Sequence, residues 1–167
     1  IDLRPEYIRS EDNHLADLLS RMIDNNDWQF QPQLFQRYQK RWGMRTIDQF
    51  ASYGNQQCER FNSAYACPGT IAVDAFTVNW RQQNNSQLEH NWWNPPWGLI
   101  PRVLRKIQDE ASGILVVPYW ASAIWWPIFR ELASVVELHP ATDSLFLPRG
   151  SQHELATPRW KVAVGKI

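Results

Sequence analysis

The chain has 167 residues, a length that suits one compact domain with short appendages. Hydrophobic residues make up 44% of it and charged residues 20%, a balance that excludes an intrinsically disordered protein. Its 17 Lys and Arg match its 17 Asp and Glu, which excludes a globally basic protein, so any contact with DNA must come from local patches or neighbouring domains.

Cysteine content and hydropathy exclude further classes. Cys58 and Cys67 are the only cysteines and form no CxxC motif, so neither a disulfide framework nor a zinc knuckle is expected. We interpret them as reduced thiols of an intracellular protein. No apolar run reaches the roughly 20 residues of a membrane-spanning helix and no signal peptide is evident, so no membrane partner is expected. Because the chain begins with Ile1 rather than Met, we expect a processed or excised piece of a longer protein.

The beginning of the chain contains a predicted boundary near residue 25. A short strand over 6–8 and a helix over 13–22 come before it, and the polar residues 25–27 end that helix. A second helix is predicted to follow Pro32 and to end at Gly43. Its apolar residues recur at helical spacing: Leu34, Phe35, Tyr38 and Trp42.

Strands and helices then alternate along the chain. Strands are predicted over 46–48, 70–74, 90–93, 114–117, 135–138 and 144–147, and helices over 99–111 and 124–133. The continuous apolar run at 114–117 is typical of a strand buried on both faces of a parallel sheet. The alternation predicts an α/β fold, a single domain with a Rossmann-like, mostly parallel sheet flanked by helices and with short N- and C-terminal appendages.

The segment Asn94-Pro95-Pro96-Trp97 forms a turn between a predicted strand and a predicted helix. The exocyclic amine of a nucleobase is a poor nucleophile, and two acceptors aimed at its hydrogens stabilise the charge that develops when it attacks a methyl group. The side-chain carbonyl of Asn94 and the backbone carbonyl of Pro95 are such a pair, held by a stiff Pro-Pro step. Trp97 offers a face on which an extruded base stacks. The alternative is an ordinary turn, because Asn-Pro and Pro-Pro are common turn signals.

The order of several short segments resembles a known family. These segments are 31–35 (QPQLF), 42–52 (WGMRTIDQFAS), 55–58 (NQQC), 74–76 (DAF) with Trp80, 94–97 (NPPW) and 115–118 (LVVP). From residue 31 to about 132 the chain is similar to short phage-type DNA adenine methyltransferases, and it looks closest to the methylase-like domain of DIRS-type tyrosine-recombinase retrotransposon polyproteins. The resemblance implies an S-adenosylmethionine-dependent DNA adenine (exocyclic amino) methyltransferase-like domain over 25–155, in an intracellular protein that is at least transiently nuclear.

The resemblance also assigns roles to individual residues. Residues 48–52 would form the loop after the first strand, beside the methionine part of the cofactor, while Asp74 accepts from the adenine amino group and Phe76 packs on the ring. The implied cofactor-binding residues are Asp48, Phe50, Ala51, Asp74 and Phe76. The implied catalytic residues, which hold the target base, are Asn94, Pro95 and Trp97. For Asp48 and Asp74 the alternative is a carboxylate at a strand end that caps a turn or helix.

Both ends of the chain carry further resemblances. Residues 13–21 are similar to the closing segment of a retroelement ribonuclease H, which makes 1–24 the tail end of such a domain. Asp17 would be the last of four metal-binding carboxylates, and no metal site is expected without the other three, which would lie outside this chain. The tail resembles the linker toward a recombinase domain, so 156–167 is assigned as a linker; its residues alone predict a frayed terminus or an edge strand. The implied partners are DNA and the reverse transcriptase, ribonuclease H and tyrosine recombinase domains of the polyprotein.

One segment departs from the family pattern. Residues 48–54 contain a single Gly where many cofactor-binding loops are Gly-rich, and no acidic residue marks a second strand end to hold the ribose hydroxyls. The alternative function is therefore a catalytically inactive Rossmann-like module that binds nucleic acid or scaffolds a larger assembly, with a filled cleft. Trp occurs in adjacent pairs at 92–93 and 125–126, and in each pair we expect one Trp to fill the core and the other to be able to contact DNA or a partner subunit.

Overall fold

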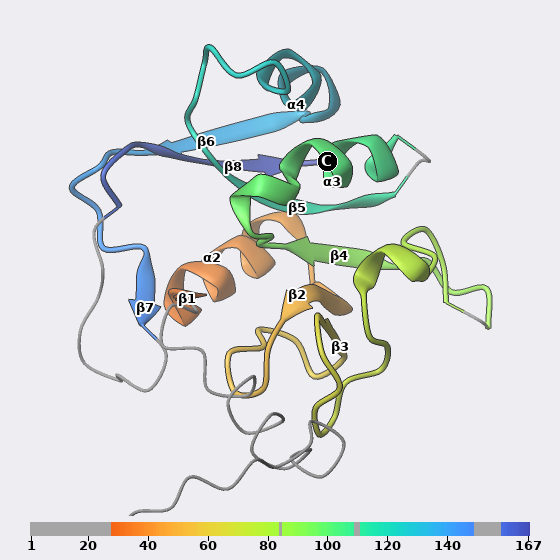
Figure 1. The fold of residues 1–167 in the computed structure, drawn as a ribbon. Helices are drawn as coiled ribbons and strands as arrows, with labels where there is room; N and C mark the ends of the chain where they lie inside the picture. The colour runs from red at the N-terminus through yellow and green to blue at the C-terminus, as the bar shows by residue number, and fades with distance from the viewer. Residues whose placement is uncertain (1–27, 84, 109–110, 149–157) are drawn as a thin grey trace, which may run out of the picture.

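A six-stranded sheet forms the centre of the protein (Figure 1). The computed structural model describes residues 28–83, 85–108, 111–148 and 158–167, so Asp17 and the predicted ribonuclease H-like tail lie outside the described residues. The strands are β2 (Ile47–Ala51), β3 (Phe61–Ser63), β4 (His90–Trp93), β5 (Ser112–Pro118), β6 (Val135–His139) and β8 (Val162–Lys166). Their order across the sheet is β3-β2-β4-β5-β8-β6.

Most neighbouring strands in this sheet are parallel. The pairs β2–β3, β2–β4 and β4–β5 are parallel, whereas β8 is antiparallel to both β5 and β6. The predicted mixed α/β fold with a mostly parallel sheet is therefore confirmed. A separate two-stranded antiparallel sheet joins β1 (Trp28–Phe30) to β7 (Phe146–Pro148), and the strand predicted over 144–147 belongs to it.

The strand order reverses between β2 and β4. From β2 the chain moves to β3 on one side. The strand predicted over 70–74 is reduced to a single parallel bridge between Val73 and Ser63. The chain then crosses to β4 on the other side of β2 and continues to β5. In open α/β sheets, ligands bind outside the carboxyl ends of the strands at such a reversal. Ser52 follows β2 and Asn94 follows β4, so both lie at this edge.

The helices cover the sheet only in part. The described α-helices are α2 (Pro32–Trp42), α3 (Ile100–Ile107) and α4 (Trp126–Leu132), with the 3₁₀ turns η1 (Ala75–Thr77) and η2 (Trp97–Leu99). No α-helix is present in the described residues between β2 and β4, which are loops and the turn η1 (Figure 1). Among these described helices, none has the length and apolar character that crossing a bilayer requires.

Alternate residues of β5 divide the core into two halves. Leu115 and Val117 pack in one cluster with residues of α3 and α4, whereas Ile114 and Val116 pack in the other with residues of α2. Burial on both faces explains the continuous apolar run of this strand. Trp92 and Trp93 divide in the same way and both are fully buried, so the expectation that one of them faces a partner is wrong.

The first strand is longer than its sequence predicts. A strand over 46–48 and then a loop were expected, but β2 continues to Ala51, so Asp48, Phe50 and Ala51 lie in a strand. The pairing with β4 stops at Asp48, and it is the parallel neighbour β3, paired at Asp48 and again at Ala51, that extends the strand. The local pattern of apolar residues does not predict such long-range pairing.

The assignment of 156–167 as a linker is wrong for its second half. Strand β8 lies inside the sheet and pairs over five residues with β5 and with β6. Val162, Ala163 and Val164 are fully buried. Its sequence alone does not distinguish an edge strand from an interior one, because the run is short and lies near the end of the chain. Its interior position depends on pairing with β5 and with β6.

Gly165 is the residue of β8 that is most sensitive to substitution. A Cβ atom at this position would lie 2.6 Å from Cε2 of Phe129, which packs on the strand from α4. We predict that Gly165→Ala lowers the free energy of unfolding by about 1–3 kcal/mol, because an overpacked core side chain must move. Gly98→Ala, where a Cβ atom meets nothing within 4 Å, is the matched control. Urea unfolding measures both, and equal stability of the two variants would contradict an interior position of β8.

Candidate functional site

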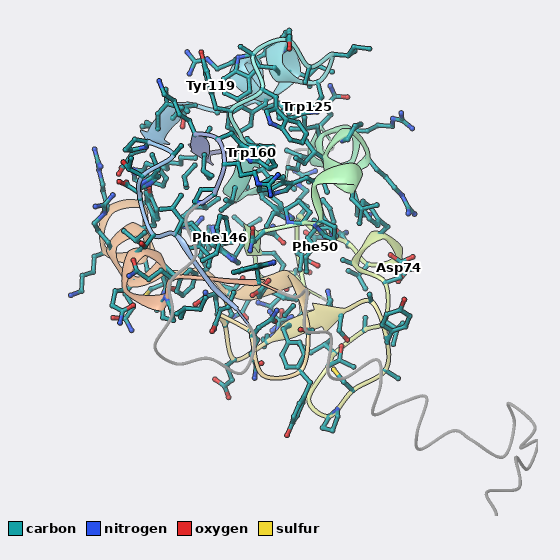
Figure 2. The ribbon with its side chains drawn as sticks, turned by 60° about the vertical axis from the view of Figure 1, so that its left-hand side comes forward. Phe50, Asp74, Tyr119, Trp125, Phe146 and Trp160 are labelled. Atoms are coloured by element: carbon teal, nitrogen blue, oxygen red, sulfur yellow. The ribbon has the colours of Figure 1, made fainter. Side chains whose placement is uncertain are left out.

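Two neighbouring cavities lie at the carboxyl edge of the sheet. The first has a volume of about 670 Å³ and the second about 420 Å³, both in the range of small-molecule sites. Phe50 and Pro96 line both cavities, so the two are separated by little more than these side chains. Figure 2 shows Phe50 between Phe146, which lines the first cavity, and Asp74, which lines the second.

Aromatic side chains form most of the walls of the first cavity. They are Trp28, Phe30, Phe50, Trp92, Trp97, Phe146 and Trp160. The ring of Trp97 lies 5.0 Å from that of Trp160 and 5.6 Å from that of Trp120, measured between centroids. Flat rings of this kind provide stacking faces for a nucleobase. Trp160 comes from the segment that the sequence assigned to a linker, so sequence reasoning missed it.

The predicted catalytic residues Asn94, Pro95 and Trp97 all line the first cavity. The Asn94 side chain forms no hydrogen bond with any other residue that the structure describes, and the Pro95 carbonyl accepts none from them. The Pro96 carbonyl, by contrast, accepts from the backbone N–H of Leu99 at 2.8 Å and starts the turn η2. The two predicted acceptors are thus available to a ligand, while the third carbonyl has a structural role.

Asp48 is separated from the other predicted cofactor residues. It lines the first cavity rather than the second, and it is 4% exposed. Its carboxylate accepts from the backbone N–H of Gln57 at 3.0 Å and of Phe50 at 3.3 Å, which fixes the loop after β2. Burial, together with this carboxylate, raises the pKa of the Cys58 thiol, so that cysteine remains protonated and is not a nucleophile.

The other four predicted cofactor residues, Phe50, Ala51, Asp74 and Phe76, line the second cavity together. Asp74 has a φ of 63° and caps η1, with its carboxylate accepting from the backbone N–H of Phe76 at 3.0 Å. At the end of β3, the hydroxyl of Ser63 lines this cavity, where no carboxylate follows the strand. The structure therefore brings residues from two separate segments together around one cavity.

Arg102 is a residue of the second cavity that the sequence did not identify. Its guanidinium carbon lies 3.8 Å from the centre of the Phe76 ring. Its helical spacing indicates only an exposed face of α3, which the structure confirms. No local signal shows which loop will pack beside that face.

A chain of hydrogen bonds between three buried amide side chains links the strands that carry the site. The Nδ2 of Asn62 donates to Oε1 of Gln49 at 2.8 Å, and the Nε2 of Gln49 donates to Oδ1 of Asn91 at 2.7 Å. The Nδ2 of Asn91 then donates to the backbone carbonyls of Trp80 and Ser112. These three amides cross the neighbouring strands β3, β2 and β4, and Gln49 also lines the second cavity.

No protein-family model, curated protein or solved structure matches this chain. The chemistry of the two cavities is therefore the basis for assigning a function.

We predict that Gln49→Leu destabilises the protein by about 2–5 kcal/mol, since it leaves one donor and one acceptor buried without a partner. The control is Gln36→Leu, at an exposed position of α2, which should change stability by roughly 0.5 kcal/mol or less. Both free energies are measured by urea unfolding. A Gln49→Leu variant as stable as its control would show that the amide chain does not hold the strands together.

Proposed function

We propose that this chain is an S-adenosylmethionine-dependent DNA adenine methyltransferase-like domain. The observation that carries the proposal is the pair of cavities that share Phe50 and Pro96. The first cavity contains the free acceptors beside an aromatic wall, and it would take the extruded base. The second contains Asp74 and Phe76, and it would take the cofactor.

The arrangement of the sheet supports this assignment. The strand order reverses between β2 and β4, and both cavities lie at the carboxyl edge there, which is where Rossmann-like sheets bind nucleotides. Strand β8 runs antiparallel between β5 and β6, so the other half of the sheet holds the parallel strands that carry the site. The sparse helices are the feature in which the chain departs from a fully flanked Rossmann-like fold.

The residues of the second cavity fit the adenine end of the cofactor. A carboxylate at Asp74 can accept from an exocyclic amine, and the Phe76 ring offers a stacking partner. At the ribose end the cavity offers Ser63, whose hydroxyl already donates to the Tyr65 carbonyl at 2.6 Å. We therefore expect the adenine contacts to supply most of the affinity. When bound, S-adenosylmethionine supplies a methyl group on a positively charged sulfur.

The residues of the first cavity account for the chemical step. Asn94 and Pro95 direct two carbonyl oxygens at the amine hydrogens of adenine, which localises the nitrogen lone pair for in-line attack. With the cofactor bound, the adenine nitrogen would take the methyl group, the electron pair of the broken carbon–sulfur bond would stay on sulfur, and the amine would lose a proton to solvent. Trp97, which lines this cavity, would hold the base by stacking.

Local positive charge supports a nucleic-acid substrate. The net charge of the chain is +0, but the exposed Arg159 lines the first cavity, and the Lys161 ammonium lies 6.0 Å from the Tyr119 ring centre. Cations beside a base pocket contact phosphates and orient the strand. The polyprotein partners and the nuclear location are carried over from the sequence resemblance alone.

The alternative function, an inactive nucleic-acid-binding or scaffolding module, predicts a filled cleft. Both cavities are open, and Asp74 and Asn94 line them, which favours the enzyme. The cluster of Trp97, Trp120 and Trp160 suits nucleic-acid stacking under either function.

We predict that Asn94→Ala lowers kcat for methyl transfer to DNA by about 100- to 1000-fold, because one acceptor of the developing charge is lost. Cofactor affinity should be unchanged, since Asn94 lines the first cavity and not the second. Transfer of labelled methyl groups and calorimetry measure the two effects, with the exposed Asn79→Ala as control. Absence of S-adenosylmethionine binding to the wild type at millimolar concentration would refute the enzyme.

We predict the opposite pattern for Asp74→Asn, with KM for S-adenosylmethionine raised about 5- to 10-fold and kcat at saturation unchanged, because a neutral acceptor replaces a charged one. Asn retains the oxygen that accepts from Phe76 and tolerates the positive φ, so η1 should persist. The exposed Glu131→Gln is the charge-matched control. An unchanged KM would remove Asp74 from the cofactor site.

A further inference from the structure

The guanidinium carbon of Arg102 lies over the Phe76 ring, 3.8 Å from its centre, and both residues line the second cavity. Arg102 is exposed and belongs to α3, whereas Phe76 is half-buried in η1. Within the described part of the chain, Arg102 forms no salt bridge that would hold it elsewhere. The contact of the planar Arg102 cation that the structure describes is with the face of the Phe76 ring.

The remaining contacts hold Phe76 in place. Phe50 meets it edge-on at 5.6 Å, and the buried Trp80 lies 5.7 Å away, between centroids. Lys106, one turn after Arg102, donates from Nζ to the Phe76 carbonyl at 3.1 Å. Arg102 is thus the exposed member of this group, and its guanidinium covers the face of the Phe76 ring that lies beneath it.

We propose that Arg102 is a ligand-binding residue that clamps a purine base against Phe76. The base enters between the guanidinium and the ring, which requires the Arg102 side chain to lift by about one ring thickness, roughly 3.5 Å. A guanidinium is suited to this because it is planar, weakly hydrated and stacks on π systems. The inference rests on the proposed function for the identity of the second cavity as the cofactor site.

Charge around the cavity adds a preference for the type of purine. Among the described residues that line it, Asp74 and Arg102 are the charged ones. A carboxylate favours a purine that carries an exocyclic amine and disfavours one with a carbonyl there, while the guanidinium acts on the ring face and does not distinguish the two. Adenosine should therefore bind more tightly than inosine, and Arg102 should contribute equally to both.

The test measures the affinity of S-adenosylhomocysteine by calorimetry for the wild type and three variants. We expect Arg102→Ala to weaken binding about 3- to 30-fold, since a desolvated cation–π stack is lost. Arg102→Lys should recover little of it, because an ammonium has no planar face. Arg105→Ala, on the same exposed helix but outside the cavity, and the wild type are the controls. The ratio of adenosine to inosine affinity should be the same in Arg102→Ala as in the wild type.

Each other outcome identifies what has failed. Unchanged or tighter binding by Arg102→Ala, with a wild type that binds, would show that Arg102 merely occupies the cavity, and the proposed function would stand without the clamp. Full recovery in Arg102→Lys would replace stacking by simple charge attraction and overturn the inference. A wild type that binds neither S-adenosylhomocysteine nor adenosine would overturn the proposed function, and the clamp with it.

Discussion

The buried amide chain of Asn62, Gln49 and Asn91 is the interaction on which the rest of the structure depends. It crosses the three strands whose carboxyl ends carry the site, and it pairs groups that would be costly to bury alone. Because each amide donates to or accepts from the amide on the next strand, the chain links β3, β2 and β4 side by side. This arrangement places Phe50 between the two cavities and directs the residues after β4 to the same edge.

At this edge, some polar groups form hydrogen bonds within the protein, and others form none with the described residues. The Asp48 carboxylate and the Pro96 carbonyl are used by backbone N–H groups of neighbouring turns. Asn94 and the Pro95 carbonyl have no such partner among the described residues. In one short turn, the Pro96 carbonyl thus sets the shape, while the Pro95 carbonyl and the Asn94 side chain, one and two residues earlier, form no hydrogen bond with the described residues. Trp97 and the other aromatic walls of the first cavity surround this pair with a stacking surface of low polarity.

The parts of the fold that local pattern determines were predicted well. The helix after Pro32 ends at Trp42 with Gly43 at a φ of 95°, and the strand at 90–93 has the predicted bounds. The turn at Asn94 follows from these neighbours. The parts that failed depend on distant pairing: the extension of β2, the interior place of β8, and the stack of Arg102 on Phe76. Side-chain periodicity shows which face of an element is apolar but not which distant segment will cover it.

The interior position of β8 has a consequence for how the protein is made. Strands β5 and β6 both pair with residues 162–166 and not with each other, so each presents an open edge until that segment has been synthesised. The sheet can then close only after translation has passed Lys166, and the intermediate before that moment is the form most exposed to aggregation. Loss of residues 162–166 would leave β6 without a partner in the sheet and would open one edge of β5, which would keep only β4.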